Sequence, residues 1–277
     1  MKKTIILFCF LTLINSGCSF FTLDKTVIKI KGSETMFNLT KRLTAEYSKE
    51  NPRIDFIVEA GGTGAGIKAL VANEIIISTA SRNLEPAEVK LLSDNFGSIG
   101  VSTSIAKDAL YIYLNKSNPI SNLSLFQVKE IFSGNITNWE KVGWKSKAIN
   151  VYLRNTSSGT LQLFKRLVLE DHEFASSSKS FNSITELHKS AELEEGSITF
   201  SGFVRNTKCK IISIDNIEPT KDNVISGYYP LTRYLFFHTL NLPEGEVKKF
   251  IDWTLGAKGQ QIIAEEGFYS LFNYSLD

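Results

Sequence analysis

Residues 26–80 read TVIKIKGSETMFNLTKRLTAEYSKENPRIDFIVEAGGTGAGIKALVANEIIISTA, and their pattern sets the architecture of the chain. Short aliphatic runs alternate with longer stretches whose apolar residues recur at helical spacing, as Leu39, Leu43 and Tyr47 do. The expected strands are 27–30, 54–58 and 75–77, and the expected helices are 37–49 and the segment after the glycine run 61–66. This βαβαβ order predicts a parallel sheet covered by helices on both faces, with 75–77 as a buried strand.

The same alternation continues to the end of the chain. Pro86 stands near the first turn of a helix that begins in 85–88, because proline is accepted at that position. Further strands are expected at 149–153 and 234–238, an extended segment at 105–114, and helices at 125–132, 159–169, 244–255 and 258–265. A chain of 277 residues with 43% hydrophobic content holds one large core or two modest ones, and we expect two lobes.

Three segments share one local design, with glycine and hydroxyl residues between a strand and the first turn of a helix. They are Gly32-Ser33-Glu34-Thr35, Gly62-Thr63-Gly64-Ala65-Gly66 and Ser157-Ser158-Gly159-Thr160. The first-turn amides of a helix lack intrahelical acceptors, and the helix dipole favours an anion there. Glycine permits close backbone approach, and Ser or Thr adds an O–H donor. These segments predict an oxyanion site.

Each segment alone is better explained as a plain helix cap. Three together, with Arg154 just before the third, favour anion binding because a guanidinium can grip two oxygens at once. Nucleotide-binding motifs are poorly matched. Ile67 separates Gly66 from Lys68, so the glycine run is not a P-loop, and the glycines do not follow G-x-G-x-x-G spacing.

With these segments in place, the sequence resembles the phosphate-binding proteins of ABC transporters, the PstS family, from about Ile28 to the C-terminus. The matching motifs, in order, are 32–36 (GSETM), 61–68 (GGTGAGIK), 80–82 (ASR), 131–134 (IFSG), 138–139 (NW), Arg154 with 157–160 (SSGT), 229–233 (YPLTR) and 259–262 (GQQI). Most are weak individually, but their order and spacing together make a strong match.

The resemblance implies an α/β fold of the periplasmic-binding-protein type II class, with two lobes joined by a two-strand hinge and the ligand cleft between them. We expect 26–104 and 236–277 to form lobe I, and 105–235 to form lobe II. It implies that inorganic phosphate is captured and presented to an ABC transporter permease. The predicted phosphate-binding residues are Ser33, Glu34, Thr35, Thr63, Ser81, Arg154, Ser158, Gly159 and Thr160.

The chain departs from the family at Arg82. Several members carry an aspartate there, which accepts a proton from phosphate that sulfate lacks. Discrimination against sulfate would therefore rest on another acceptor, such as Glu34, Glu59, Asp108 or a hydroxyl oxygen. We expect Arg82 to support the site from behind rather than to touch the anion.

The N-terminus has the layout of a secretory signal peptide in residues 1–17, with two early lysines, an apolar run and small or polar residues before Cys18. That run is too short to cross the roughly 30 Å core of a bilayer as a helix. Residues 13–18 resemble a lipobox, although Asn15 stands where leucine is usual. We predict a signal peptide at 1–17, lipid attachment at Cys18 and a lipidated tether at 18–25. An ordinary signal peptide cut nearby is the alternative.

Loss of the signal peptide would remove two of the 31 basic residues and leave them equal in number to the 29 acidic ones. A nucleic-acid partner is not predicted, since it would need clustered Lys and Arg. Cys209 would be the only free thiol of the mature chain, so no disulfide is expected. The three histidines are too scattered to form a zinc site, and no metal or cofactor is predicted.

Three alternatives remain. The same fold could bind another oxyanion, such as sulfate, molybdate or tungstate. A serine hydrolase could use Ser158 with His172 or His188, although the G-x-S-x-G motif is missing, and we do not expect an enzyme. A surface adhesin or signalling module could keep the fold without transport. We expect a monomer held at the extracytoplasmic, periplasmic side of the cell membrane by its lipid.

Overall fold

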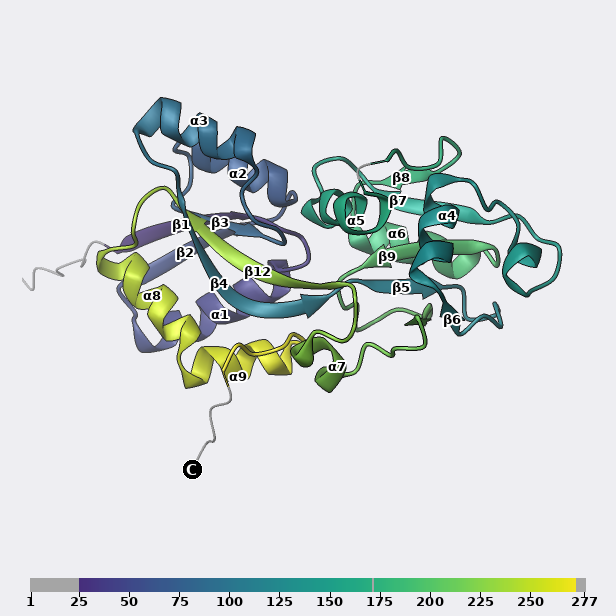
Figure 1. The fold of residues 1–277 in the computed structure, drawn as a ribbon. Helices are drawn as coiled ribbons and strands as arrows, with labels where there is room; N and C mark the ends of the chain where they lie inside the picture. Colours follow the sequence, from purple (N-terminus) through teal and green to yellow (C-terminus); the bar gives the residue numbers. More distant parts are fainter. Residues whose placement is uncertain (1–24, 171, 273–277) are drawn as a thin grey trace, which may run out of the picture.

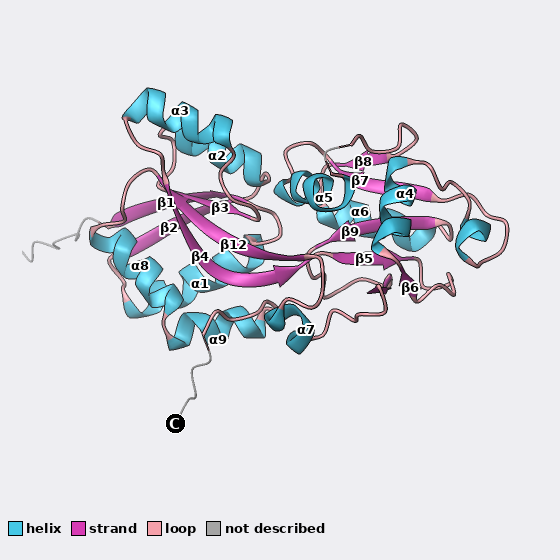
Figure 2. Ribbon diagram, viewed as in Figure 1, coloured by secondary structure: helices cyan, strands magenta, loops and turns pink. Residues whose placement is uncertain are grey.

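The computed structural model describes residues 25–170 and 172–272, in which two five-stranded sheets are flanked by helices (Figure 1). Figure 2 shows helices on both faces of the first sheet, as the βαβαβ pattern predicts. Each sheet and its helices form one lobe.

The first sheet has the strand order β2-β1-β3-β12-β4. Its strands are β1 (Thr26–Gly32), β2 (Ile54–Glu59), β3 (Ile77–Ala80), β4 (Val101–Ala109) and β12 (Thr232–Thr239). Its helices are α1 (Phe37–Glu50), α2 (Thr63–Val71), α3 (Pro86–Phe96), α8 (Gly245–Leu255) and α9 (Ala257–Glu265). Glu85 and Glu88 form a capping box at the start of α3, with Pro86 as its first residue.

Two details of this sheet differ from the sequence-based expectation. Although β1 pairs in parallel with β2 and β3, β12 is antiparallel to both β3 and β4, so the sheet is mixed. The buried strand is Ile77–Ala80 rather than 75–77, and Ile76 is 41% exposed. The backbone N–H of Ile76 donates to the carbonyl of Lys29 in β1 at 3.0 Å, and the strand β3 itself begins at the next residue, Ile77.

The chain crosses between the lobes at two adjacent points. The strand β4 ends at Ala109, and β5 (Tyr111–Leu114) begins two residues later in the second sheet, so the extended segment 105–114 is divided between two sheets. The return crossing leads into β12, and the N–H of Leu110 donates to the carbonyl of Leu231 at 2.7 Å. The expected lobe boundaries, 104/105 and 235/236, fall inside β4 and β12.

The second sheet has the order β10-β5-β9-β7-β8. Besides β5, its strands are β7 (Asn150–Arg154), β8 (Lys179–Phe181), β9 (Ser197–Ser201) and β10 (Lys210–Ile211). Its helices are α4 (Leu125–Ser133), α5 (Gly159–Leu169), α6 (Ile184–Leu193) and α7 (Lys221–Ser226), with a 3-10 turn at Trp139–Val142. Two short strands, β6 (Asn122–Leu123) and β11 (Ser213–Ile214), form a separate pair.

Each lobe has its own hydrophobic core. In the first, Tyr47 packs edge-on against Phe250, with 5.3 Å between ring centroids. In the second, Phe164 stacks on Phe200 at 3.7 Å, and Phe132 packs against both. Two separate cores leave the lobes free to move as units about the two crossings.

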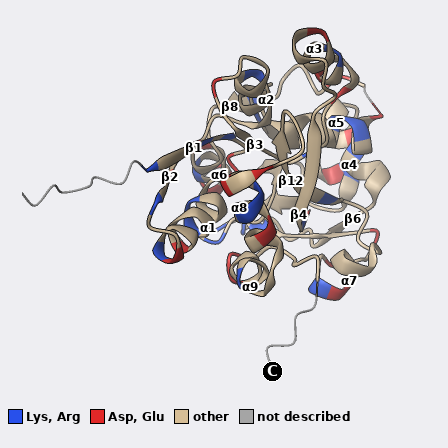
Figure 3. Cartoon of the chain, turned by 90° about the vertical axis from the view of Figure 1, so that its left-hand side faces the viewer, with Lys and Arg blue, Asp and Glu red and all other residues tan. Residues whose placement is uncertain are grey.

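Basic and acidic residues are interspersed along α1, α8 and α9, as the colours of the cartoon in Figure 3 show. Arg42 pairs with Glu266 at 2.8 Å, and Lys249 pairs with Glu246 at 2.7 Å. Along these described helices, basic residues thus alternate with acidic ones rather than gathering in a stripe.

Candidate anion-binding site

A small cavity between the lobes, of about 10 Å³, collects all nine residues of the predicted site. It is lined by Ser33, Glu34, Thr35, Gly62, Thr63, Ser81, Arg154, Ser158, Gly159 and Thr160. Gly62 is the one addition to the predicted set. Most of the hydroxyl and charged side chains in it are buried, so their polar atoms need partners inside the protein or on a ligand.

Three strand-to-helix junctions bring these residues together. Residues 33–35 follow β1, Thr63 begins α2, and Gly159 begins α5. Ser81 follows β3 and Arg154 ends β7. Figure 1 shows α2 and α5 meeting from opposite lobes near their N-termini. Two sets of first-turn N–H groups and two positive dipole ends therefore lie beside one cavity.

Two glycines allow this close approach. Gly62 has a φ of 94°, and a Cβ there would lie 2.7 Å from the carbonyl oxygen of Ser157. A Cβ on Gly159 would lie 2.4 Å from Thr63 Oγ1. Any larger residue at either position would therefore push the two helix ends apart.

The three junctions use their polar side chains differently. Ser158 is a helix cap, because its Oγ accepts from the N–H of Leu161 at 3.3 Å. The helix α2 begins after Gly62, which has no side chain, and α1 has no side-chain cap at Met36. Simple capping therefore accounts for one of the three junctions and leaves the side chains of the other two available for a ligand.

Three cavity hydroxyls each accept a hydrogen bond from a fixed N–H donor. Thr63 Oγ1 accepts from the N–H of Ser81 at 3.1 Å, Ser158 Oγ from Leu161, and Thr160 Oγ1 from Arg233 Nη1 at 2.6 Å. A hydroxyl has a single proton, so each one is left to donate it elsewhere. The cavity is therefore rich in donors, which suits an anion whose oxygens are acceptors.

Arg154 and Glu34 form an ion pair across the two lobes. Arg154 also donates to the carbonyls of Phe181 at 3.3 Å and Asn182 at 2.9 Å. Glu34 also accepts from the N–H of Ile184, at the start of α6, at 3.2 Å. Burial lowers the pKa of Arg154, and the negative charge of Glu34 opposes that shift.

The other acidic residues considered for selectivity lie elsewhere. Glu59 is 55% exposed and pairs with Lys31 at 2.9 Å, and Asp108 is fully buried and bonded to Arg233. Neither lines the cavity, whereas Glu34 does.

Arg82 lies beside the site but does not line it. Its side chain is 1% exposed and donates to both carboxylate oxygens of Glu88 at 2.8 Å, and its Nε donates to Gln162 in the other lobe at 2.5 Å. Arg82 therefore joins the lobes behind Ser81.

Arg233 was missed as a functional residue from sequence. It stood in the matching motif 229–233 but received no role, and yet it bonds directly to Thr160. The available signal was a lone charge in the strand TRYLFFHT, whose other side chains are mainly apolar or aromatic.

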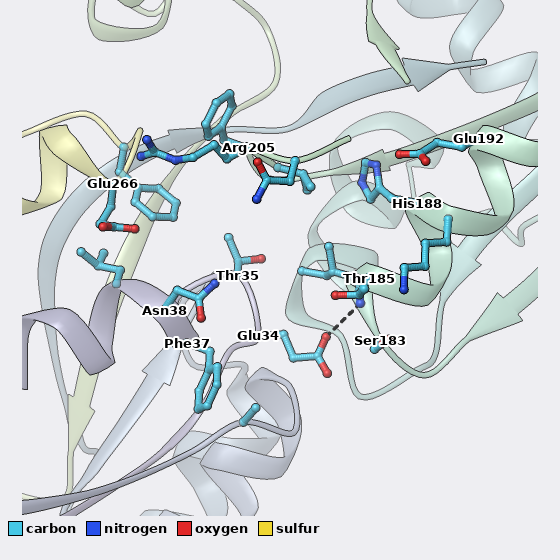
Figure 4. A pocket seen from close by; sticks show the side chains of 18 residues that line it. Glu34, Thr35, Phe37, Asn38, Ser183, Thr185, His188, Glu192, Arg205 and Glu266 are labelled. Carbon is cyan, nitrogen blue, oxygen red and sulfur yellow. Dashed lines mark hydrogen bonds between the residues drawn. The ribbon is translucent and has the colours of Figure 1, made fainter. Parts of the chain in front are cut away.

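A larger cleft of about 940 Å³ adjoins the small cavity, and Glu34 and Thr35 line both (Figure 4). It lies between the N-terminal end of α1 and the helix α6. His188 of α6 faces this cleft, and its two ring nitrogens bond Thr207 at 3.1 Å and Ser201 at 2.9 Å. Burial lowers the pKa of His188 to about 4, so its imidazole is neutral at pH 7.

The hydrolase alternative requires a histidine beside Ser158. His188 bonds Thr207 and Ser201, and His172 Nδ1 bonds the carbonyl of Leu169, at the far end of α5 from Ser158. A helix of eleven residues is about 16 Å long, so His172 does not reach the start of α5. This geometry gives no support for a nucleophile and base pair.

No group of three or more His, Cys, Asp or Glu in residues 25–170 and 172–272 is arranged to hold a metal ion. Within the same ranges, no helix has the length and apolar character needed to cross a membrane. The predicted signal peptide, Cys18 and most of the tether lie outside the described residues.

Comparison with known proteins identifies the family. The model of the PBP superfamily domain matches residues 22–258. The phosphate-binding protein PstS of Staphylococcus epidermidis is 30% identical, over 87% of this chain and 77% of its own length. The PstS of Borreliella burgdorferi is 29% identical, over 98% of this chain and 99% of its own length.

Solved structures agree with this result. A Clostridium perfringens protein, provisionally assigned as the substrate-binding protein of a phosphate ABC transporter and crystallised with bound phosphate, has a TM-score of 0.82 and 25% identity, over 89% of this chain and all of that one. A phosphate transport receptor from Vibrio cholerae has a TM-score of 0.72 and 26% identity, over 87% of this chain and 99% of that one. The chain therefore belongs to the PBP superfamily, with the type II fold expected from its sequence, and within it to the phosphate-binding PstS family.

Proposed function

We propose that this protein captures inorganic phosphate outside the cytoplasmic membrane and delivers it to an ABC transporter. The observation that carries the proposal is the set of donors from both lobes around one cavity, in which three hydroxyls are left to donate. Relatives at up to 30% identity are named as phosphate-binding proteins, and a similar structure holds bound phosphate.

Phosphate binding would close the two lobes without chemical change to the ligand. The N–H of Gly64 in the first lobe donates to the carbonyl of Ser157 in the second at 3.1 Å, and Ser81 Oγ lies 3.5 Å from Thr160 Oγ1. A ligand that bonds both lobes favours the arrangement in which these contacts form. The transporter would then recognise the closed shape.

We propose that Glu34 provides selectivity for phosphate. In several relatives an aspartate at the position of Arg82 has this role. An ionised carboxylate can only accept hydrogen bonds. It can therefore accept one from the P–OH group of phosphate, whereas it repels sulfate, which has no proton at neutral pH. Glu34 is the only one of the three acidic candidates that lines the cavity.

The test is isothermal titration of the soluble chain from Ser19 onward, stripped of ligand, with phosphate and with sulfate as competitor. We expect tight phosphate binding that excess sulfate does not disturb. Equal binding of the two anions would favour the broader oxyanion alternative, and sulfate, molybdate and tungstate would be titrated in turn. Absence of phosphate binding would refute the proposal.

We propose that the chain is exported by residues 1–17 and anchored by lipid on Cys18, with 18–25 as the tether. The first strand begins at Thr26, so a tether of this length leaves the folded lobes free of the membrane. Labelling of cells with a radioactive fatty acid should mark the wild-type protein and not the Cys18→Ala variant. We also propose a monomer, which gel filtration with light scattering would check.

A further inference from the structure

The two crossing strands share a buried ion pair between Asp108 of β4 and Arg233 of β12. Arg233 Nε and Nη2 donate to Asp108 Oδ2 at 2.9 and 2.6 Å, and the side chains are 2% and 0% exposed. The remaining end of the guanidinium, Nη1, donates to Thr160 Oγ1 at 2.6 Å. Neither Asp108 nor Arg233 lines the anion cavity.

Stability alone does not explain this pair. Withdrawing two charges from water is costly, and well-packed apolar residues in their place are often as stable or more so. Burial raises the pKa of Asp108, and Arg233 opposes that rise. Contact with Arg233 thus favours the ionised carboxylate of Asp108, at a place where both side chains are shielded from water.

Gly202 packs directly against the ion pair. A Cβ on Gly202 would lie 2.7 Å from Arg233 Nη2 and 2.9 Å from Asp108 Oδ2. The same Cβ would lie 2.7 Å from Cγ2 of Thr35, a cavity residue. Glycine at this position therefore lets the backbone close over the ion pair at the edge of the site.

The direction of the bond to Thr160 follows from donor chemistry. A guanidinium carries five N–H donors and no acceptor, so Thr160 Oγ1 must accept from Arg233. Its own proton then points away from Arg233, towards Ser81 Oγ at 3.5 Å or into the cavity. A separation of 3.5 Å is long for a bond between hydroxyls, so an anion oxygen in the cavity is the better acceptor.

We propose that Arg233, held by Asp108, is a positioning residue that fixes Thr160 as a hydrogen-bond donor to bound phosphate. This inference rests on the proposed function. Arg233 lies in the sheet of the first lobe, whereas Thr160 lies on α5 of the second. The donor is therefore set when the lobes adopt this relative orientation, which links the crossing strands to the site.

A double-mutant cycle measured by phosphate titration tests the inference. The first change is Thr160→Val, which removes the hydroxyl at nearly constant shape. The second is Asp108→Asn with Arg233→Met, which removes both charges together and so leaves no lone buried charge. We expect the second change to weaken phosphate binding at least tenfold in the wild-type background and less than twofold in the Thr160→Val background.

A matched control uses the ion pair of the buried Arg82 with the half-buried Glu88, through Arg82→Met with Glu88→Gln. This pair also reaches across the lobes, to Gln162, but it touches no cavity hydroxyl. Whatever its effect on affinity, that effect should be the same within twofold in the wild-type and Thr160→Val backgrounds. Thr160→Ser keeps the hydroxyl and should keep the coupling to Arg233.

The inference would be overturned if Asp108→Asn with Arg233→Met weakened phosphate binding equally in the wild-type and Thr160→Val backgrounds, or did not weaken it in the wild-type background. Either result would leave the proposed function intact. If the wild-type protein did not bind phosphate, both the inference and the proposed function would be overturned. The titration of the wild-type protein is sufficient to show this. Thermal unfolding without phosphate shows whether each variant folds. If the variant that combines Asp108→Asn with Arg233→Met does not, Arg233→Lys replaces it in the cycle, since lysine keeps the charge but lacks the fork that spans both partners.

Discussion

Three arginines lie at or beside the cavity, and each is paired with a carboxylate. The pairs are Arg154–Glu34, Arg233–Asp108 and Arg82–Glu88. The positive charges are therefore already balanced within the protein, and an anion would be held mainly by N–H and O–H donors. This arrangement makes individual donors and acceptors decisive for both affinity and selectivity.

Replacement of Glu34 by glutamine should reduce selectivity for phosphate over sulfate. The amide brings N–H donors to the cavity wall and removes the negative charge that opposes an unprotonated anion. A hydrogen bond to a charged group contributes about 1.5–3 kcal/mol, so we expect the ratio of the two dissociation constants to fall by at least tenfold. Competition titration measures this ratio.

Glu59→Gln is the control for that experiment, because Glu59 is exposed, pairs with Lys31 and lies outside the cavity. Its selectivity ratio should match that of the wild type. An unchanged ratio in Glu34→Gln would remove Glu34 from the selectivity mechanism.

His188 should make the free energy of unfolding depend on pH between 6.5 and 4. Its pKa in the folded protein is lowered to about 4 by burial, from an ordinary value of 6.5. Between these two pH values the imidazole is protonated in the unfolded chain but not in the folded protein. The free energy of unfolding therefore decreases as the pH is lowered, by up to about 1.4 kcal/mol per pH unit. Burial also lowers the pKa of His238 to about 4, which adds a second contribution of the same sign.

When the pH is lowered from 6.5 to 4, the melting temperature of the His188→Gln variant should therefore decrease less than that of the wild type. Thermal unfolding at a series of pH values measures this. His172→Gln, at an exposed position, should follow the wild-type profile. If the melting temperatures of the wild type and His188→Gln changed in parallel with pH, His188 would not contribute to the pH dependence of stability.

Among the elements, α2 and α5 depend on glycine to bring their first turns together. Gly159→Ala would place a Cβ 2.4 Å from Thr63 Oγ1, so the helix ends must separate. We expect phosphate binding to weaken by about 100-fold or more, because several donors from the two lobes then fail to reach one ligand at once. The melting temperature without phosphate should change little, since neither core is touched.

Gly64→Ala is the matched change in the first turn of α2. A Cβ there would lie 3.4 Å from the carbonyl oxygen of Ser157, an ordinary contact, and alanine favours a helix. Its phosphate affinity should stay within about threefold of the wild type. Equal effects of the two alanines on titration would contradict the steric argument.

The sequence predicted elements well where local chemistry defines their ends. The helix α5 has the predicted bounds 159–169, with Ser158 as the cap at its start, and α3 starts at the predicted proline. The cavity residues in 33–35, 62–63 and 158–160 were predictable because glycine and hydroxyl residues mark helix starts in the sequence itself, whereas Ser81 was expected only from the resemblance to the PstS family.

What the sequence did not predict depends on contacts between distant segments. The antiparallel direction of β12 is set by its partners β3 and β4, which are remote in the sequence. The division of 105–114 at Leu110 is set by where the two sheets part. The role of Arg233 depends on a helix more than seventy positions earlier in the chain. Local periodicity holds no information on any of these.

For the whole molecule, a ligand that joins the lobes should stabilise the folded protein by mass action. Phosphate at 100 times its Kd should add about 2.7 kcal/mol to the free energy of unfolding. For a chain of this size that corresponds to a rise of several degrees in melting temperature, measurable by scanning calorimetry. Thr63→Ala removes a hydroxyl donor and should show a smaller rise at the same phosphate concentration.

A full rise in Thr63→Ala would place the ligand outside the cavity, and no rise in the wild type would mean that phosphate does not bind the folded state. The buffer for these scans must itself be free of phosphate. A chloride titration serves as a control, since it changes ionic strength without supplying the tetrahedral oxygens.

The position of β12 between β3 and β4 has a consequence for the order in which the chain folds. The second lobe is built from the continuous segment 110–231, so all of its strands are available once that segment is made. The first lobe must wait for β12, α8 and α9, and until then β3 has an open edge and β4 has no neighbour. An unpaired edge of this kind is prone to pair with other chains. A protein that crosses a membrane with its N-terminus first would therefore complete its second lobe before its first, and its early strands would need protection until the last part of the chain arrives.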